Sequence, residues 1–357
     1  DDAGTDTVVE AADGGTDLFD FSPSNIDITL TIDAALAAMI ENILGGAGDD
    51  TFIFTDGTTL AGYIDGNGGL NALNFSTYTN GQSVTLSGLA SQVGFTGTIS
   101  LLGDEFTNIS TLVASGALGD SLTGLNAAST WQLPGGTNGT YSNSRDLSFT
   151  GFETLNGGSA ADTFNVTGAA TFDVNGNAGD DTLAFADGAS LTGTLAGGAG
   201  TDTLSLAVDT ARHTITLTGI TGSDFDGNVS GTTFTGVNTL VGGSGNDTLV
   251  GMDAPARWQI TGAAAGNYIG TATLAFSAMD TLVGGSGTDL LDYSSLSTPV
   301  TADLSTNSAT GFNAVSGFEN LTGGSGDDTL SGDGGANIII GGAGNDTING
   351  GDGDDTY

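Results

Sequence analysis

The sequence of 357 residues contains no cysteine and no lysine, and its only fixed cations are Arg145, Arg212 and Arg257. Without cysteine there can be no disulfide, no thiolate metal site and no cysteine nucleophile. A single histidine, His213, makes a zinc site unexpected and excludes the H-E-x-x-H motif. Nucleic acid is excluded as a partner because phosphate binding needs Lys and Arg. No apolar run is long enough to span a membrane, so membrane insertion is not expected.

Negative charge is what the sequence has in excess. Asp and Glu number 42, the formal net charge is −39, and only five of the acidic residues are Glu. Aspartate favours turns and is a short oxygen ligand for hard cations, whereas acidic helix surfaces favour Glu. Such a charge repels itself in a compact chain, so bound counter-ions are expected.

Disorder, a common state of acidic chains, is not favoured by the rest of the composition. Hydrophobic residues make up 38% of the chain, and 17 residues are Phe. Disordered acidic segments are poor in aromatic and β-branched residues. Together, 62 Gly and only four Pro indicate many tight turns between short strands.

A nine-residue repeat fills residues 323–357. Its four units begin at Gly323, Gly332, Gly341 and Gly350 and follow G-G-x-G-x-D-x-U-x, where U is large and apolar. The second unit departs from the motif, because it lacks the second Gly and has Asn337 in place of Asp. The first six positions predict a turn, because glycine permits positive φ and close backbone stacking. The last three predict a short strand whose apolar residue points inward.

The same nonapeptide recurs singly along the chain. It reads GGAGDDTFI at 45, GGAGTDTLS at 197, GGSGNDTLV at 242 and GGSGTDLLD at 284, with degraded copies at 157 and 176. The pattern apolar-x-x-apolar-x-G-G precedes most copies, as in Phe318-Glu319-Asn320-Leu321-Thr322-Gly323-Gly324.

Regular spacing of these turns predicts the architecture. Where neighbouring turns are visible, they lie 18 to 23 residues apart, and the runs between them alternate as strands do. The sequence therefore predicts an all-β fold, a parallel β-solenoid or β-roll with Gly-Asp calcium-binding turns and coils of about 18–23 residues.

A gapless offset of 127 residues indicates a duplicated module, because it aligns Trp131 with Trp258 and Tyr141 with Tyr268. We expect an N-terminal solenoid region over 1–118, one module copy over 119–245, a partial copy over 246–322 and a tandem β-roll over 323–357. The segment 33–44 also has apolar residues at helical spacing, but its likeness to the Phe318 pattern favours a strand.

The repeats resemble the RTX calcium-binding β-roll of secreted toxins, proteases, lipases, adhesins and bacterial surface-layer proteins. The resemblance covers the four tandem units and the scattered single copies. It implies several Ca²⁺ ions held by all-oxygen cages, with turns 323 and 341 sharing one ion and turns 332 and 350 another. For the single copies, tight turns with solvated aspartates remain an alternative.

Carried over by the resemblance, the sixth-position aspartates and the turn glycines of three tandem units are the expected calcium ligands. Asp162 is doubtful because Ala160 replaces a turn glycine, and Asn337 is expected to weaken any site it lines. The expected ligand residues are Asp50, Asp181, Asp202, Asp247, Asp289, Gly323, Gly324, Gly326, Asp328, Gly341, Gly342, Gly344, Asp346, Gly350, Gly351 and Asp355.

Catalysis is not expected. The nucleophile motif G-x-S-x-G is absent, and His213 is interpreted as an exposed residue at a strand end. Trp131 and Trp258 occupy equivalent module positions, which favours packing anchors, with a carbohydrate-stacking platform as the alternative.

The resulting hypothesis is a calcium-dependent structural β-solenoid of a large protein at the bacterial cell surface: a fibre, an adhesin stalk or a surface layer. We expect the chain to be a piece of a longer polypeptide whose export signal lies outside it, and to leave the cell unfolded, as in type I secretion. Expected partners are further copies, head to tail or lateral, or other surface proteins or glycans. The alternatives are the non-catalytic repeat region of a secreted enzyme and a glycan-binding adhesin module.

Overall fold

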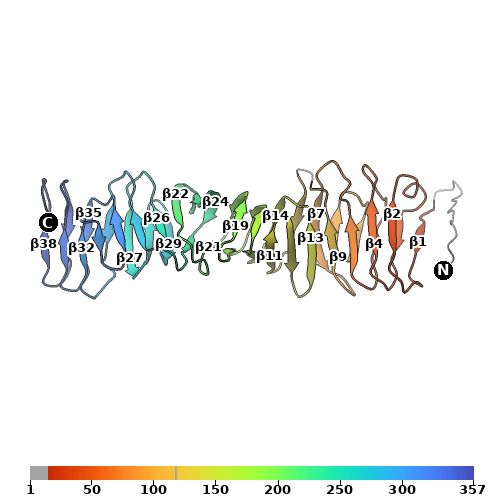
Figure 1. Cartoon of the computed structure of the whole chain (residues 1–357), viewed down its shortest axis with the longest axis horizontal. Coiled ribbons are helices and arrows are strands. Elements are labelled where there is room, and N and C mark those ends of the chain that lie inside the picture. The colour runs from red at the N-terminus through yellow and green to blue at the C-terminus, as the bar shows by residue number, and fades with distance from the viewer. Residues whose placement is uncertain (1–14, 117–118) are drawn as a thin grey trace. The chain divides into compact units, whose positions relative to one another are not determined.

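The computed structural model describes residues 15–116 and 119–357, and the regular structure in them is entirely β (Figure 1). The predicted all-β class is confirmed. Because the described residues form no helix, none of them belongs to a helix that could cross a membrane. Residues 1–14 and 117–118 of the predicted N-terminal region lie outside the described residues.

The chain forms two compact units. The first consists of the chain up to Asp162 together with the short segment Ala170–Val174. The second consists of Thr163–Ala169 and Asn175–Tyr357. The predicted boundaries near residues 118, 245 and 322 stay predictions.

The strands are short, as expected for chains interrupted by frequent glycine turns. Up to Asp162 they are β1 (Leu18–Asp20), β2 (Thr29–Ile32), β3 (Asn42–Leu44), β4 (Thr51–Phe54), β5 (Ile64–Asp65), β6 (Asn71–Asn74), β7 (Ser83–Leu89), β8 (Phe95–Ile99), β9 (Glu105–Val113), β10 (Ser121–Thr123), β11 (Thr130–Gly135), β12 (Asn138–Ser142), β13 (Asp146–Thr150) and β14 (Thr154–Asn156). Beyond it they are β15 (Thr163–Val166), β16 (Ala169–Thr171), β17 (Asp173–Asn175), β18 (Thr182–Phe185), β19 (Ser190–Thr192), β20 (Thr194–Ala196), β21 (Thr203–Ser205), β22 (Thr214–Thr221), β23 (Asp224–Val229), β24 (Thr232–Val237), β25 (Thr239–Val241), β26 (Thr248–Val250), β27 (Arg257–Gly262), β28 (Ala265–Ile269), β29 (Thr273–Ser277), β30 (Thr281–Val283), β31 (Leu290–Asp292), β32 (Thr301–Asp303), β33 (Ser308–Ala309), β34 (Ala314–Ser316), β35 (Asn320–Thr322), β36 (Thr329–Ser331), β37 (Ile338–Ile340) and β38 (Thr347–Asn349).

Successive coils stack through parallel strands within each unit, as the solenoid prediction requires. In the first unit β2, β4 and β6 pair in parallel, with Phe52 between Leu30 and Leu73. In the second unit β35 pairs with β37, so that Leu321 lies opposite Ile339, eighteen residues further on. In most three-residue strands the central apolar residue is buried while its neighbours are more exposed, which builds a thin core within each unit.

Antiparallel meanders interrupt this parallel stacking, and the sequence did not reveal them. β7, β8 and β9 form one, β11, β12 and β13 a second, β22, β23 and β24 a third, and β27, β28 and β29 a fourth. Coils that carry a meander are longer than the predicted 18–23 residues; Leu204 of β21, for example, pairs with Leu240 of β25.

Each meander has a glycine on its middle strand, over which a phenylalanine of the third strand packs. A Cβ at Gly139 of β12 would overlap the ring of Phe149, and a Cβ at Gly266 of β28 would lie 2.8 Å from the ring of Phe276. The glycine therefore makes room for the aromatic ring on one face of the sheet.

The two segments related by the 127-residue offset adopt the same strands, β11–β13 and β27–β29. Trp131 contacts Tyr141 edge-on at 4.7 Å between ring centroids, and Trp258 contacts Tyr268 at 4.8 Å. Both tryptophans are fully buried. They are packing anchors, and their burial contradicts a carbohydrate-stacking platform at these two residues.

The segment 33–44 is a strand only at its end. β3 begins at Asn42, whereas residues 34–39 form consecutive turns. Asp33 caps these turns by accepting hydrogen bonds from the N–H groups of Ala35 and Leu36 at 3.0 and 2.8 Å. The strand prediction was therefore wrong for residues 34–39, because this local capping favours turns over extension.

Candidate calcium sites

The sixth-position aspartates turn their side chains into their own turns. In the turns at 45, 242 and 323, the Oδ2 atoms of Asp50, Asp247 and Asp328 accept the N–H of the second glycine at 2.6, 2.7 and 2.6 Å. These aspartates are buried. The short aspartate side chain thus stabilises each turn by a hydrogen bond within the turn, since these six residues have no large apolar side chain to bury.

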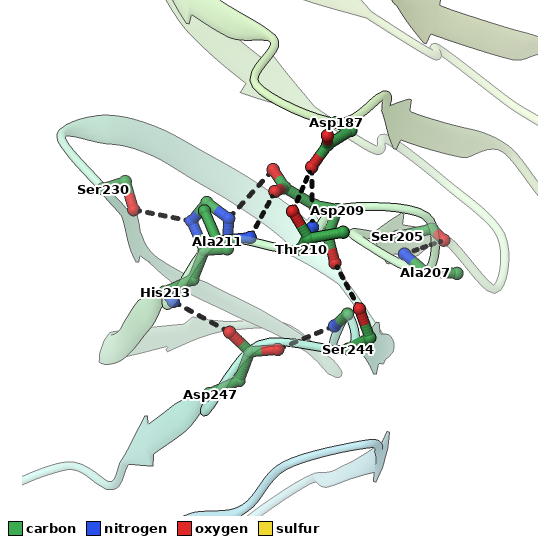
Figure 2. A network of polar contacts seen from close by, with 11 residues as sticks. Asp187, Ser205, Ala207, Asp209, Thr210, Ala211, His213, Ser230, Ser244 and Asp247 are labelled. Carbon is green, nitrogen blue, oxygen red and sulfur yellow. Dashed lines mark hydrogen bonds and ion pairs between the residues drawn. The ribbon is translucent and has the colours of Figure 1, made fainter.

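The second carboxylate oxygen reaches the preceding coil. Oδ1 of Asp50 accepts the N–H of Ile28 at 2.9 Å, and Oδ1 of Asp328 accepts that of Val300 at 2.8 Å. Asp247 does the same with the N–H of His213 at 2.8 Å, as Figure 2 shows. Each aspartate thus ties two successive coils together.

Where one plain coil follows another, the backbone N–H of the sixth-position residue donates to the corresponding side chain one coil further on. Asp181 donates to Asp202 at 2.8 Å, Asp328 to Asp346 at 2.9 Å, and Asn337 to Asp355 at 2.9 Å. Turns 323 and 341 and turns 332 and 350 are therefore stacked neighbours; that each pair shares an ion stays a prediction.

In other coils this backbone N–H donates to a polar side chain that was not among the expected ligand residues. The N–H groups of Asp120, Asp202, Asp247 and Asp289 donate to Glu153 Oε2, Asn238 Oδ1, Asp280 Oδ2 and Glu319 Oε2, at 2.7–2.9 Å. Each acceptor is the second residue of the apolar-x-x-apolar-x-G-G pattern, so its polar identity was a usable signal.

The first glycine of a nonapeptide lies against two oxygen atoms. A Cβ at Gly45 would lie 2.6 Å from both Asp50 Oδ2 and the carbonyl oxygen of Gly66 in the next coil. Gly323 meets Asp328 Oδ2 and the Gly341 carbonyl in the same way. Only glycine leaves the space between these oxygens open.

The other tandem glycines among the expected ligands leave no room for a side chain, and several of them also have a backbone conformation that favours glycine. Gly342 and Gly344 have φ of 97° and 125°, and Cβ atoms there would overlap the carbonyl oxygens of Gly324 and Gly326. Gly351 also has positive φ, 92°. At Gly341 and Gly350 a Cβ would overlap the carboxylate of the sixth-position aspartate of the same turn.

Asp162, doubtful from the sequence, is built like the others. It is buried, and it accepts the N–H of Gly158 at 2.7 Å and the N–H of Ser129 at 2.8 Å. The serine hydroxyl adds a third bond at 2.6 Å. The loss of a glycine at Ala160 has not removed this aspartate from its turn.

The arrangement leaves negative charge uncompensated. Asp202 and Asp289 are completely buried, and their Oδ2 atoms form no hydrogen bond of normal geometry, although the neutral Trp258 side chain lies near the Asp289 carboxylate. Burial raises the pKa of Asp50 and Asp202, and burial together with the nearby Glu319 carboxylate raises the pKa of Asp289 to about 6.

This donor set fits Ca²⁺. The groups offered are carboxylate and carbonyl oxygens, which suit a hard cation and not zinc or copper. Across residues 15–116 and 119–357 no three His, Cys, Asp or Glu side chains form a metal-binding cluster, so any site there relies on backbone carbonyls as well as on one or two carboxylates. When bound, the ion supplies positive charge that replaces the missing protein cations.

His213 is held in a polar network and is not the exposed residue that the sequence suggested. Its Nδ1 lies 2.9 Å from Ser230 Oγ and its Nε2 lies 3.0 Å from Asp209 Oδ2 (Figure 2). The buried Asp209 also accepts the N–H of Ala211, and its carbonyl accepts that of Ser244. The network fastens this loop to the Asp247 turn.

A family model described as RTX calcium-binding nonapeptide repeat (4 copies) matches residues 232–254, 277–294 and 317–357. The C-terminal region thus carries RTX repeats, which bind Ca²⁺ and are typical of secreted extracellular proteins. No curated protein matches the chain. The match does not identify individual ligands, so ligation by each of the expected residues stays a prediction, and Asp50, Asp181 and Asp202 lie outside the matched segments.

Proposed function

We propose that this chain is a structural β-solenoid of a large bacterial cell-surface protein, a fibre, adhesin stalk or surface layer, which folds when Ca²⁺ binds. The observation that supports the proposal is the set of buried sixth-position aspartates. Among the described residues, neither Asp202 nor Asp289 forms an ion pair with an Arg or His. Burying an unpaired charge costs several kcal/mol per ion, so a bound cation is expected to stabilise the fold.

Calcium then acts as a folding switch. Extracellular calcium modules have Kd values of about 10⁻⁴–10⁻³ M, so such sites empty at the low calcium level inside a cell and fill outside it. Because the sites form only in the folded chain, binding free energy becomes folding free energy. Repulsion among the carboxylates keeps the calcium-free chain unfolded and exportable.

Circular dichroism during thermal unfolding tests this proposal. The protein is expected to be unfolded, or to melt at a much lower temperature, in chelator than in millimolar calcium. Equal melting temperatures in the two conditions would rule out the calcium-dependent fold.

We also propose that the chain is not an enzyme. The arrangement Ser230–His213–Asp209 has the order of a hydrolase triad, but the N–H of Gly231, which follows the serine, already donates to Asn228 Oδ1 at 2.9 Å. In serine hydrolases the N–H after the nucleophile often helps to bind the oxyanion. A serine-directed fluorophosphonate is expected to leave Ser230 unmodified; labelling of this residue would contradict the proposal.

As partners we propose further copies of the chain, head to tail or lateral, or other surface proteins or glycans. Support comes from the parallel backbone pairing that joins coil to coil, because another copy can supply the same interaction. Electron microscopy with and without calcium distinguishes calcium-dependent assemblies from isolated molecules. The alternative of a repeat region attached to a secreted enzyme is less well supported, because meanders interrupt the plain roll.

A further inference from the structure

The stacking of coils over a nonapeptide turn takes two forms in the second unit. Over turn 323–328 lies another nonapeptide, and the carbonyl of its first residue, Gly341, covers Gly323. Over turn 284–289 lies only the short corner at 317–319, and the carbonyl of Gly317 covers Gly284. The corner replaces six turn residues and carries no sixth-position aspartate.

Glu319 occupies the place of that missing aspartate. In the complete stack the N–H of Asp328 donates to Asp346 Oδ1 at 2.9 Å, and at the corner the N–H of Asp289 donates to Glu319 Oε2 at 2.7 Å. Glu319 follows its covering carbonyl by two residues, whereas Asp346 follows Gly341 by five.

The same corner recurs over two other turns. Gly236, Ala278 and Gly317 all have positive φ, between 54° and 71°, and their carbonyls cover the first glycines Gly197, Gly242 and Gly284. Two residues after each comes the acceptor of the turn's N–H. These acceptors are Asn238, Asp280 and Glu319.

At the corner over turn 284–289 the oxygen groups lack a counter-charge. Asp289 is completely buried, and its Oδ2 forms no hydrogen bond of normal geometry. The nearby Trp258 side chain lowers the pKa of Asp289 as a neutral donor and supplies no positive charge. A Cβ at Gly284 would lie 2.9 Å from this Oδ2 and would overlap the Gly317 carbonyl oxygen, so both oxygens face one small space. The Glu319 carboxylate adds a second negative charge next to Asp289, and it helps to raise the pKa of Asp289.

We propose that Glu319 is a calcium ligand, which completes with Asp289 and the Gly317 carbonyl a cation site where no second nonapeptide is present. By the same geometry, Asp280 is a ligand at the corner over the Asp247 turn. At the corner over the Asp202 turn, Asn238 offers an uncharged amide oxygen in its place. The inference rests on the proposed calcium-dependent folding and extends it to turns that the nonapeptide motif does not pair.

The variant Glu319→Gln tests the charge apart from the hydrogen bond. Glutamine keeps an oxygen for the N–H of Asp289 but removes the carboxylate, so a purely structural role predicts unchanged calcium binding. If Glu319 is a ligand, equilibrium dialysis shows about one Ca²⁺ fewer per chain or one site weakened on the order of tenfold. In chelator the variant is expected to be at least as stable as the parent chain, because a like charge has gone from beside Asp289.

Glu105→Gln is the matched control, because this glutamate is exposed on β9. It is expected to bind calcium as the parent does. A second variant, Asn238→Asp, adds the carboxylate that the Asp202 corner lacks and is expected to tighten calcium binding and to destabilise the chain in chelator.

The outcomes separate the two proposals. If the parent chain binds no calcium, the proposed function fails. If the parent binds calcium while Glu319→Gln keeps both its stoichiometry and its affinity, the corner ligand is overturned and the calcium-dependent fold stands.

Discussion

At the scale of single residues, Asp328 joins three parts of the second unit. Its carboxylate accepts the N–H groups of Gly324 and Val300, and its own N–H donates to Asp346. Asp328→Ala leaves two buried donors unpaired and removes a calcium ligand. Since each unpaired donor costs about 1–3 kcal/mol, we expect a loss of about 3 kcal/mol in the free energy of unfolding, measured by urea denaturation in calcium.

The neighbouring Asp327→Ala is the control. Asp327 is exposed and accepts only the N–H of Asn345 among its described hydrogen bonds. Its loss is expected to cost less than about 1 kcal/mol. An equal effect of both substitutions would show that position six has no special role.

Asn337 occupies the sixth position of its repeat, where the other three tandem repeats have aspartate. A hydrogen bond of its side chain explains why the fold accommodates an amide there. Its Nδ2 donates to the Glu319 carbonyl at 2.7 Å, a bond that no aspartate can make. Asn337→Asp is therefore expected to lower stability in chelator and to raise it in calcium, where the added charge can bind the ion. Melting temperatures in the two conditions should move in opposite directions; a parallel shift would contradict ligation from this turn.

At the scale of elements, the meanders depend on a glycine beneath an aromatic ring. Phe149 cannot move away from a Cβ at Gly139, because it packs edge-on against Trp131, Phe152 and Phe172. Gly139→Ala is expected to destabilise the chain by about 2 kcal/mol through overpacking. Adding Phe149→Leu should relieve the overlap and recover part of this loss relative to the Phe149→Leu single variant.

Gly88→Ala on β7 serves as the comparison, because a Cβ there meets no atom within 4 Å. Urea denaturation should show little change for this variant. If Gly139→Ala proves equally harmless, the ring does not require the glycine.

The meanders were missed for a physical reason. A strand such as β22, with Ile215 and Leu217 buried, alternates in the same way whether its neighbour is parallel or antiparallel. Alternation reports which side chains face the core and says nothing about the direction of the partner strand. In contrast, the nonapeptide fixes turn, strand and coil length together, so the tandem β-roll could be predicted from the sequence.

At the scale of the whole molecule, the formal charge of −39 should make stability depend on salt when calcium is absent. Raising NaCl from about 0.1 M to about 1 M shortens the Debye length from about 10 Å to about 3 Å and weakens repulsion among the carboxylates. In chelator, the β-sheet signal in circular dichroism or the urea midpoint should rise with salt, and the rise should be smaller in calcium. A salt-independent midpoint in chelator would show that repulsion does not control folding.

Magnesium offers a second test at this scale. The turns supply backbone carbonyls and few carboxylates, whereas Mg²⁺ demands near-ideal octahedral geometry and gives up its waters reluctantly. At equal ionic strength, magnesium is expected to restore much less of the melting temperature than calcium. Equal rescue by both ions would indicate simple screening.

The sequence by itself determined the turns, the calcium chemistry and the coil length of the plain coils, because Gly and Asp at fixed spacing leave one local structure. Only the tertiary structure decided which residues face each turn from the next coil. Glu319 reaches Asp289 because a short corner stacks on a nonapeptide, and that contact depends on which coils are neighbours. Backbone stacking between coils is a long-range property, so the local pattern marks the polar position of Glu319 but cannot say which turn it faces.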